Sequence, residues 1–215
     1  MNTQPILAFD CACVGGSVAL RVGTTTTTHR LSQTKEAAEL IPGIDALLNA
    51  NGVAYSMLGS IITTVGPGSF TGVRIGLATL HGLALAHPIP VKTITTLGAM
   101  AWAVAQKSDA PHEFYTALRA GKGEVYAQRF TITDANPLAI ADITLMPENF
   151  TAWNAPCYGN HLAPEDAHYL HGPDAATLCA IAEHLPTTTL AHALPIYIRP
   201  PDAIAAAPLA WLRVN

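Results

Sequence analysis

The sequence feature that most constrains this chain is a glycine-rich turn that leads into a long apolar segment. Residues 65–76 read VGPGSFTGVRIG and follow the short apolar run 60–65. This order is typical of phosphate-binding loops, because free N–H groups and the helix dipole converge at a helix N-terminus. Here no Lys follows the glycines and Pro67 removes one backbone donor, so we interpret Ser69 or Thr71 as a helix cap.

The segment that follows, residues 71–86, is predicted to be a helix with apolar side chains pointing in almost every direction. A helix on the outside of a sheet should present a polar face to water, and this one has very little of it. We expect it to be covered either by a second protein, at whose surface an Arg is favoured, or by the rest of its own fold. The positions expected to meet a second protein are Gly72, Arg74, Ala78, His81 and Leu85.

Around this helix, the pattern of apolar runs and turns predicts an α/β protein with sheets of mixed direction. A meander of strands comes first and strand–helix alternation follows, which gives parallel strands joined by crossover helices. A polar connection at 107–112 divides the chain into an N-terminal lobe, 1–106, and a smaller C-terminal lobe, 107–215. We expect strands at 6–10, 17–22, 24–31, 60–65, 91–95, 113–118, 124–131 and 140–145, and helices at 34–50, 71–86, 97–106 and 173–184.

Composition excludes several classes of protein. Half of the residues are hydrophobic and 12% are charged, which is typical of a globular protein rather than a disordered one. The net charge of −4 argues against a broad basic face for nucleic acid. No basic run precedes the first apolar stretch and no segment reaches the roughly 20 apolar residues of a membrane span, so we expect a cytoplasmic protein. The four cysteines are expected to be small buried side chains.

No constellation of residues predicts catalysis. His112-Glu113 begins the His-Glu-x-x-His pattern of zinc peptidases, but Thr116 stands where the second His is needed. The histidines at 161, 168 and 171 lie among Pro and Gly residues in a predicted loop, so we expect no metal site. No Ser occupies a Gly-x-Ser-x-Gly elbow. We therefore assign no catalytic residue and no metal ligand.

The phrase GPGSFTGVRIGLATLHGLA, with ILAFD before it and GEVYA after it, resembles the TsaB family of bacterial proteins. The resemblance covers the first 130 residues in order and continues weakly to PIYIRP near the end. It implies an actin-like, ribonuclease-H-like fold of the ASKHA superfamily, with two lobes. It also implies an inactive relative of the glycoprotease-like enzyme TsaD, with which such proteins form a heterodimer. TsaD, assisted by the ATPase TsaE, transfers a threonylcarbamoyl group to an adenosine of tRNA.

The resemblance also implies which surfaces matter. The family's contact surface is built from two helices that match residues 36–50 and 71–86, so Leu40, Ile44 and Leu47 join the expected partner-binding residues. ATP or ADP and a metal are expected on the partner or at the shared interface, and no cofactor on this chain. The residues expected nearest to a nucleotide are Asp10, Ser69 and Thr71.

This sequence departs from the family at the turn after its first strand, where Asp10 is followed by Cys11-Ala12-Cys13 instead of Asp-Thr-Ser. Active relatives use those hydroxyls on nucleotide phosphates, so we favour Asp10 as a turn cap.

Two functions therefore remain. The first is a non-catalytic partner of TsaD that meets tRNA only through the assembled complex and forms a homodimer when alone. The second is a weak ATPase or phosphotransferase that acts by itself.

Overall fold

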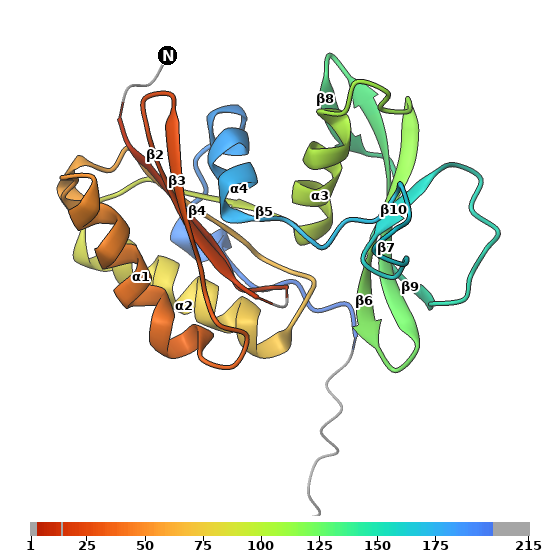
Figure 1. Cartoon of the computed structure of the whole chain (residues 1–215), viewed down its shortest axis with the longest axis horizontal. Helices are drawn as coiled ribbons and strands as arrows, with labels where there is room; N and C mark the ends of the chain where they lie inside the picture. The colour runs from red at the N-terminus through yellow and green to blue at the C-terminus, as the bar shows by residue number, and fades with distance from the viewer. Residues whose placement is uncertain (1–3, 14, 200–215) are drawn as a thin grey trace, which may run out of the picture.

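The computed structural model describes residues 4–13 and 15–199, which form two lobes (Figure 1). The first lobe is built on a five-stranded sheet with the order β3-β2-β1-β4-β5. The strands β1 and β4 are buried along their whole length, as their apolar residues require at the centre of a sheet. The β1–β2 and β2–β3 pairs are antiparallel, whereas β1–β4 and β4–β5 are parallel, so the predicted mixed sheet is confirmed. Its strands are β1 (Ile6–Asp10), β2 (Ser17–Val22), β3 (Thr25–Arg30), β4 (Ser60–Thr64) and β5 (Val91–Ile94).

Helices cover both faces of this sheet (Figure 1). On one face lie α1 (Glu36–Ala50) and α2 (Phe70–Ala86), which pack on the core formed by the apolar side chains of β1, β2 and β4. Pro42 lies inside α1 rather than in its first turn. On the other face, α4 (Ala175–Ile181) contacts β1 and β2 and continues into the short helix η2 (Ala182–His184). Among the described residues, no helix is long and apolar enough to span a bilayer.

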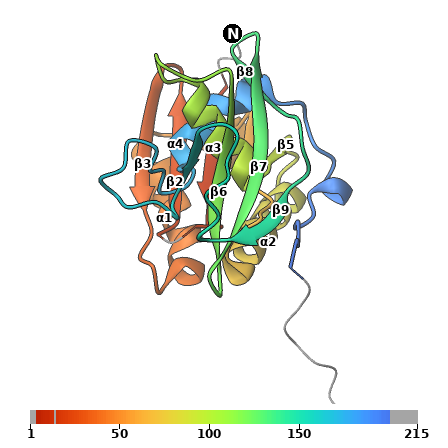
Figure 2. The same ribbon diagram turned by 90° about the vertical axis from the view of Figure 1, so that its right-hand side faces the viewer.

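The second lobe is built on another five-stranded mixed sheet, which packs against α3 (Thr96–Ala105), as Figure 2 shows from the side of the sheet. Its strand order is β10-β6-β7-β8, and β9 also pairs with β7. The pair β10–β6 is parallel and the others are antiparallel. Its strands are β6 (Glu113–Gly121), β7 (Glu124–Thr133), β8 (Asn136–Ala139), β9 (Thr144–Pro147) and β10 (Cys157–Gly159).

Two predicted elements differ from the structure. The single strand expected at 140–145 is replaced by β8 and β9, because one edge of the long strand β7 is paired in two parts, by β8 at its C-terminal half and by β9 at its N-terminal half. The helix expected at 173–184 is divided into α4 and η2. Helix α4 begins where the Asp174 carboxylate accepts a hydrogen bond of 2.7 Å from the Thr177 N–H.

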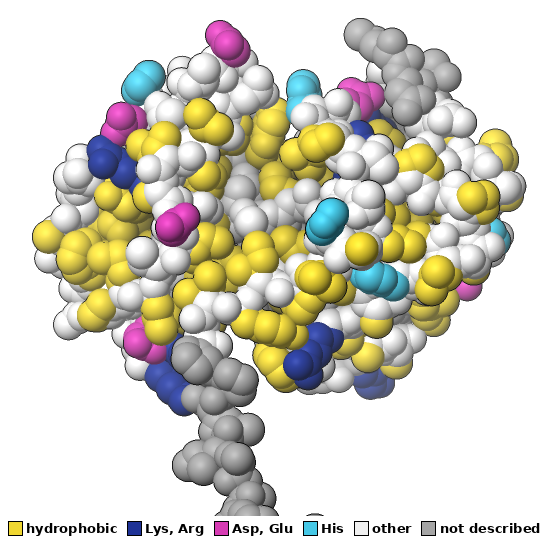
Figure 3. Space-filling view, turned by 180° about the vertical axis from the view of Figure 1, so that it is seen from behind, with side chains coloured by type: hydrophobic (Ala, Val, Ile, Leu, Met, Phe, Trp, Pro, Cys, Tyr) yellow, Lys and Arg dark blue, Asp and Glu magenta, His cyan; other side chains and the backbone are white. Residues whose placement is uncertain are grey.

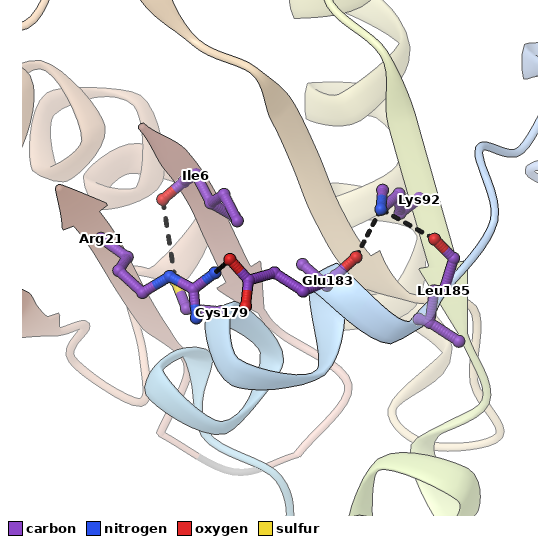
Figure 4. Close-up of polar contacts among 7 residues, drawn as sticks. Ile6, Arg21, Lys92, Cys179, Glu183 and Leu185 are labelled. Carbon is purple, nitrogen blue, oxygen red and sulfur yellow. Dashed lines mark hydrogen bonds and ion pairs between the residues drawn. The ribbon is translucent and has the colours of Figure 1, made fainter. Parts of the chain in front are cut away.

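The helix α4 returns from the second half of the sequence to the first lobe, and polar contacts hold it there (Figure 4). Arg21 on β2 forms an ion pair of 2.6 Å with Glu183. Lys92 on β5 donates to the carbonyls of Ala182 and Leu185, which satisfies carbonyl groups that the end of the helix leaves free. Because α3 packs on the second sheet and α4 on the first, the chain passes between the lobes more than once.

Candidate partner interface and interlobe cavity

The turn after β1 holds Asp10, whose side chain is only 2% exposed. Its carboxylate accepts hydrogen bonds from the Thr64 hydroxyl and from the Cys13 N–H, the latter at 3.4 Å. Burial raises the pKa of Asp10 to about 6, although these hydrogen bonds act in the opposite direction. These hydrogen bonds support the role that we favoured for Asp10, the cap of the turn.

The four cysteines are buried and free, as predicted. Burial raises the pKa of Cys11 and Cys13, and the neighbouring Asp10 carboxylate raises it further. Burial alone raises the pKa of Cys157 to about 12. All of these thiols are therefore protonated at neutral pH, which makes them poor nucleophiles and poor metal ligands.

The glycine-rich turn forms a helix cap. The Ser69 hydroxyl accepts a hydrogen bond of 3.1 Å from the Gly72 N–H, and Ser69 donates its own N–H to the Ala12 carbonyl at 2.8 Å. Thr71 lies in the first turn of α2 and is exposed. The sequence allowed either Ser69 or Thr71 as the cap, and the structure has Ser69 in that role. The backbone hydrogen bond of Ser69 to Ala12 also holds the start of α2 against the turn that contains Asp10.

Three sides of α2 are distinct in the structure. One side, which includes Val73, Leu77 and Leu80, is buried in the first lobe. A second side is flanked by the chain's own C-terminal part, because the His81 ring is 2.9 Å from the Ala193 carbonyl and Ile196 donates its N–H to Val65. The remaining side is exposed. The apolar surface that the sequence predicts on this helix is therefore partly covered by the chain itself and partly exposed.

The expected partner-binding residues divide accordingly. Four of them are buried in the chain itself, so a partner surface has to be built without them. Leu40, Ile44 and Leu47 lie in the core beneath α1, and a Cβ at Gly72 would come within 1.7 Å of the Cys11 carbonyl oxygen. Helical spacing on α1 identified its apolar residues correctly but could not tell which of them face the core and which face outward.

An exposed surface nevertheless remains on the outer sides of α1 and α2, which contact each other on the same face of the sheet. Leu85 is 79% exposed, Phe70 is 51% exposed and Ile41 is 40% exposed. Large apolar side chains that are exposed together on one surface are typical of an interaction site. Hydrophobic side chains are also spread over much of the face shown in Figure 3. We call the exposed outer surface of α1 and α2 the helix-pair surface. It is defined by Ile41, Phe70, Arg74, Ala78 and Leu85.

At one end of this surface, two aromatic rings hold Arg74. Its guanidinium carbon lies 3.6 Å from the centre of the Phe70 ring and 5.7 Å from the centre of the Tyr197 ring. Its Nε donates a hydrogen bond of 2.9 Å to the Tyr197 hydroxyl. Sequence reasoning selected Arg74 but missed Phe70 and Tyr197. Both lie in sequence segments that carry the family resemblance, SFTG and PIYIRP, and these segments are the signal from which the two residues could have been selected.

A cavity of about 990 Å³ lies between the lobes, next to Arg74. The first lobe contributes the turn after β1 and the start of α2, and the second contributes the β6–β7 hairpin and the loop around Asn160. Ser69 lines this cavity, whereas Asp10 and Thr71 are not among its lining residues. The described residues that line it include no Asp or Glu; they are Ala12, Cys13, Pro67, Gly68, Ser69, Phe70, Arg74, Leu118, Arg119, Ala120, Gly121, Tyr126, Asn160, Tyr169, His171, Ile196, Tyr197, Ile198 and Arg199.

The histidines of the predicted loop do not converge. His161 lies 3.9 Å from the Cys157 sulfur, His168 packs against the Tyr158 ring, and His171 faces the cavity. Within the described residues, no three His, Cys, Asp or Glu side chains are grouped closely enough to hold a metal ion. What the site offers is therefore a surface and a cavity suited to binding.

The sheet order β3-β2-β1-β4-β5, with helices on both faces and a second lobe across a cavity, defines a protein of the actin-like, ribonuclease-H-like class. A family model described as "TsaD: tRNA N6-adenosine threonylcarbamoyltransferase" matches residues 30–173, and the chain belongs to this family.

Curated relatives add a more specific likeness. The chain is 35% identical over 122 residues to the tRNA threonylcarbamoyladenosine biosynthesis protein TsaB of Escherichia coli, which covers 56% of this chain and 52% of that protein. It is also 35% identical over 127 residues to the Haemophilus influenzae protein of the same name, covering 59% and 53%. The resemblance to TsaB is confirmed. The chain spans about half the length of the curated relatives it matches.

Solved structures confirm the fold. The chain is similar to an uncharacterized Pseudomonas aeruginosa protein with similarity to peptidase YEAZ, with a TM-score of 0.77 and 25% identity over 91% of this chain and 100% of that chain. A second structure, YeaZ from Pseudomonas aeruginosa, matches with a TM-score of 0.74 and 24% identity over 91% of this chain and 100% of that chain. The two-lobed α/β fold that the resemblance implied is therefore present throughout the matched length.

Proposed function

We propose that this chain is a non-catalytic accessory subunit in the synthesis of N6-threonylcarbamoyladenosine in tRNA, where it binds and activates a TsaD-like protein. The observation that carries the proposal is the exposed helix-pair surface, on which Leu85 is 79% exposed. The names of the curated relatives supply the pathway. The protonated thiols and the enclosed Asp10 are consistent with a role in binding rather than in chemistry.

The role of RNA in this proposal is indirect. The net charge of −4 favours contact with tRNA only through the assembled complex, because a protein without a basic face gains little from phosphate contacts. ATP or ADP and a metal then belong to the partner or to the shared interface, and a TsaE-like ATPase joins the larger complex.

A binding measurement tests the proposal directly. Leu85→Glu places a charge on the helix-pair surface, and Ala78→Arg places a bulky cation there, so each variant should weaken binding to a TsaD-like protein by at least about tenfold. The matched control is Leu138→Glu, which changes a 56% exposed leucine on β8 in the other lobe. Calorimetric titration should give the control the wild-type affinity. Equal loss in the control, or no binding by the wild type, would contradict the proposal.

A second function, a stand-alone ATPase or phosphotransferase, is favoured by the interlobe cavity of about 990 Å³, which is large enough for a nucleotide. Against it, Asp10 is bonded to Thr64 and Cys13 and does not line the cavity. Titration of the isolated chain with ATP and Mg²⁺ separates the two functions. Saturable binding together with turnover would favour the second.

A further inference from the structure

The Arg74 side chain is fixed in place although it is exposed. The Phe70 ring lies under its guanidinium carbon at 3.6 Å, and the Tyr197 hydroxyl accepts from its Nε at 2.9 Å. An arginine normally loses much conformational freedom when it enters an interface, and here that loss has already occurred. Because the bonded atom is Nε, the two terminal amino groups remain available for the fork geometry that a carboxylate matches.

The charge of Arg74 is also not neutralised. Four other arginines of the described chain pair with glutamates: Arg21 with Glu183, Arg119 with Glu148, Arg129 with Glu113 and Arg199 with Glu124. Arg74 has no such pair among the described residues. Helix α2 carries no Asp or Glu, and neither type occurs among residues 4–13 and 15–199 that line the adjacent cavity. Arg74 is therefore a fixed cation, packed on aromatic rings, for which the described part of the chain provides no acidic partner.

A second copy of the chain cannot readily supply the missing anion through the same two helices. The acidic residues of α1 are Glu36, Glu39 and Asp45, and each is already bonded within its own chain, to Gly16, Ser32 and Tyr55 respectively. A two-fold contact between helix-pair surfaces would thus bring two Arg74 side chains to a surface on which each α1 carboxylate already accepts a hydrogen bond within its own chain. A different protein with a carboxylate at that place would be the better match.

We propose that Arg74 determines the specificity of the helix-pair surface: it forms a bidentate ion pair with a carboxylate of a TsaD-like partner, and this pair favours the heterodimer over a homodimer. The inference rests on the proposed function and adds the chemistry by which the partner is recognised. An ion pair at the edge of an apolar contact contributes specificity, because a partner that lacks the matching carboxylate leaves the arginine unpaired.

The test compares two equilibria in the same set of variants. Arg74→Glu should weaken binding to the purified TsaD-like protein of the same organism by at least about 30-fold, because it opposes two carboxylates. Arg74→Met, which keeps apolar contact with Phe70, should lose about tenfold and should flatten the dependence of affinity on salt. Sedimentation equilibrium of the same variants without the partner should show a homodimer that neither substitution weakens, and Arg74→Met should tighten it because an unpaired cation leaves the contact.

The control is Arg30→Glu, which makes the same change of charge on the exposed strand β3. It should leave both equilibria as in the wild type. If the wild type binds the TsaD-like protein and Arg74→Glu binds it equally well, the inference is wrong while the proposed function stands. If Arg74→Glu weakens the homodimer as much as the heterodimer, Arg74 gives no specificity and the inference is again wrong. If the wild type does not bind the TsaD-like protein, both fail.

Discussion

Asp10 shows how one buried residue makes the stability of this chain depend on pH. The residue is 2% exposed, and burial raises the pKa of its carboxyl group from the ordinary 3.8 to about 6. Between these two values the folded state keeps a proton that the unfolded state has released. The unfolded state therefore binds fewer protons, and the free energy of unfolding must fall as the pH rises through this interval.

We expect Asp10→Asn to remove this pH dependence. The amide keeps a carbonyl oxygen as an acceptor but cannot ionise, so the variant should be more stable than the wild type at pH 8, by up to roughly 3 kcal/mol. The advantage should disappear near pH 4, where the wild-type carboxyl is protonated in the folded state. Urea denaturation at both pH values measures the difference. An equal difference at both pH values would show that ionisation of Asp10 is not its cause.

The role of Asp10 was predictable from the sequence, because a carboxylate at the end of a strand that leads into a turn has a local function. Its hydrogen bond with Thr64 was not predictable, since the two residues are 54 positions apart and meet only through the parallel pairing of β1 and β4. The same limit applies to Arg74. Its position on α2 follows from helical spacing, but Tyr197, which holds it, lies 123 positions away.

At the scale of an element, two glycines of α2 differ in their surroundings. Gly72, near the start of the helix, is needed for close packing, whereas Gly82, in its C-terminal half, is not. A Cβ at Gly72 would lie 1.7 Å from the Cys11 carbonyl oxygen, whereas a Cβ at Gly82 would have nothing within 4 Å. The bare backbone at Gly72 thus serves close packing inside the chain, against the turn after β1. The sequence predicts a contact with a second protein at this glycine, whereas the group that approaches it belongs to the same chain.

This contrast gives a paired prediction. Gly72→Ala should destabilise the chain by about 3 kcal/mol or more, because the start of α2 must move away from the turn. Gly82→Ala, in the same helix and exposed, should stabilise the chain by about 0.5–1 kcal/mol through helix propensity alone. Urea denaturation followed by circular dichroism measures both. Similar effects of the two substitutions would refute the close approach at Gly72.

At the scale of the whole molecule, the positions of most strands and helices along the chain followed from periodicity, because local patterns fix local structure. The return of α4 to the first sheet did not, since its anchors are the distant residues Arg21 and Lys92. Nor did the division of α2 into covered and open sides. That division leaves an apolar surface whose state in the isolated chain is a property of the molecule rather than of one helix.

The isolated chain is expected to hide this surface by self-association. A second copy is the available partner, and a two-fold contact buries Leu85 and Ile41, which are 79% and 40% exposed, on both copies at once. The missing anion for Arg74 limits how tight such a dimer becomes, so we expect an equilibrium between monomer and dimer at micromolar concentration.

Leu85→Glu should shift this equilibrium towards the monomer, and Leu138→Glu on the other lobe should not. Sedimentation velocity over a range of concentrations measures the shift. A monomer that shows no dependence on concentration would mean that the surface stays open in water, and a loss of dimer in both variants would place the contact elsewhere.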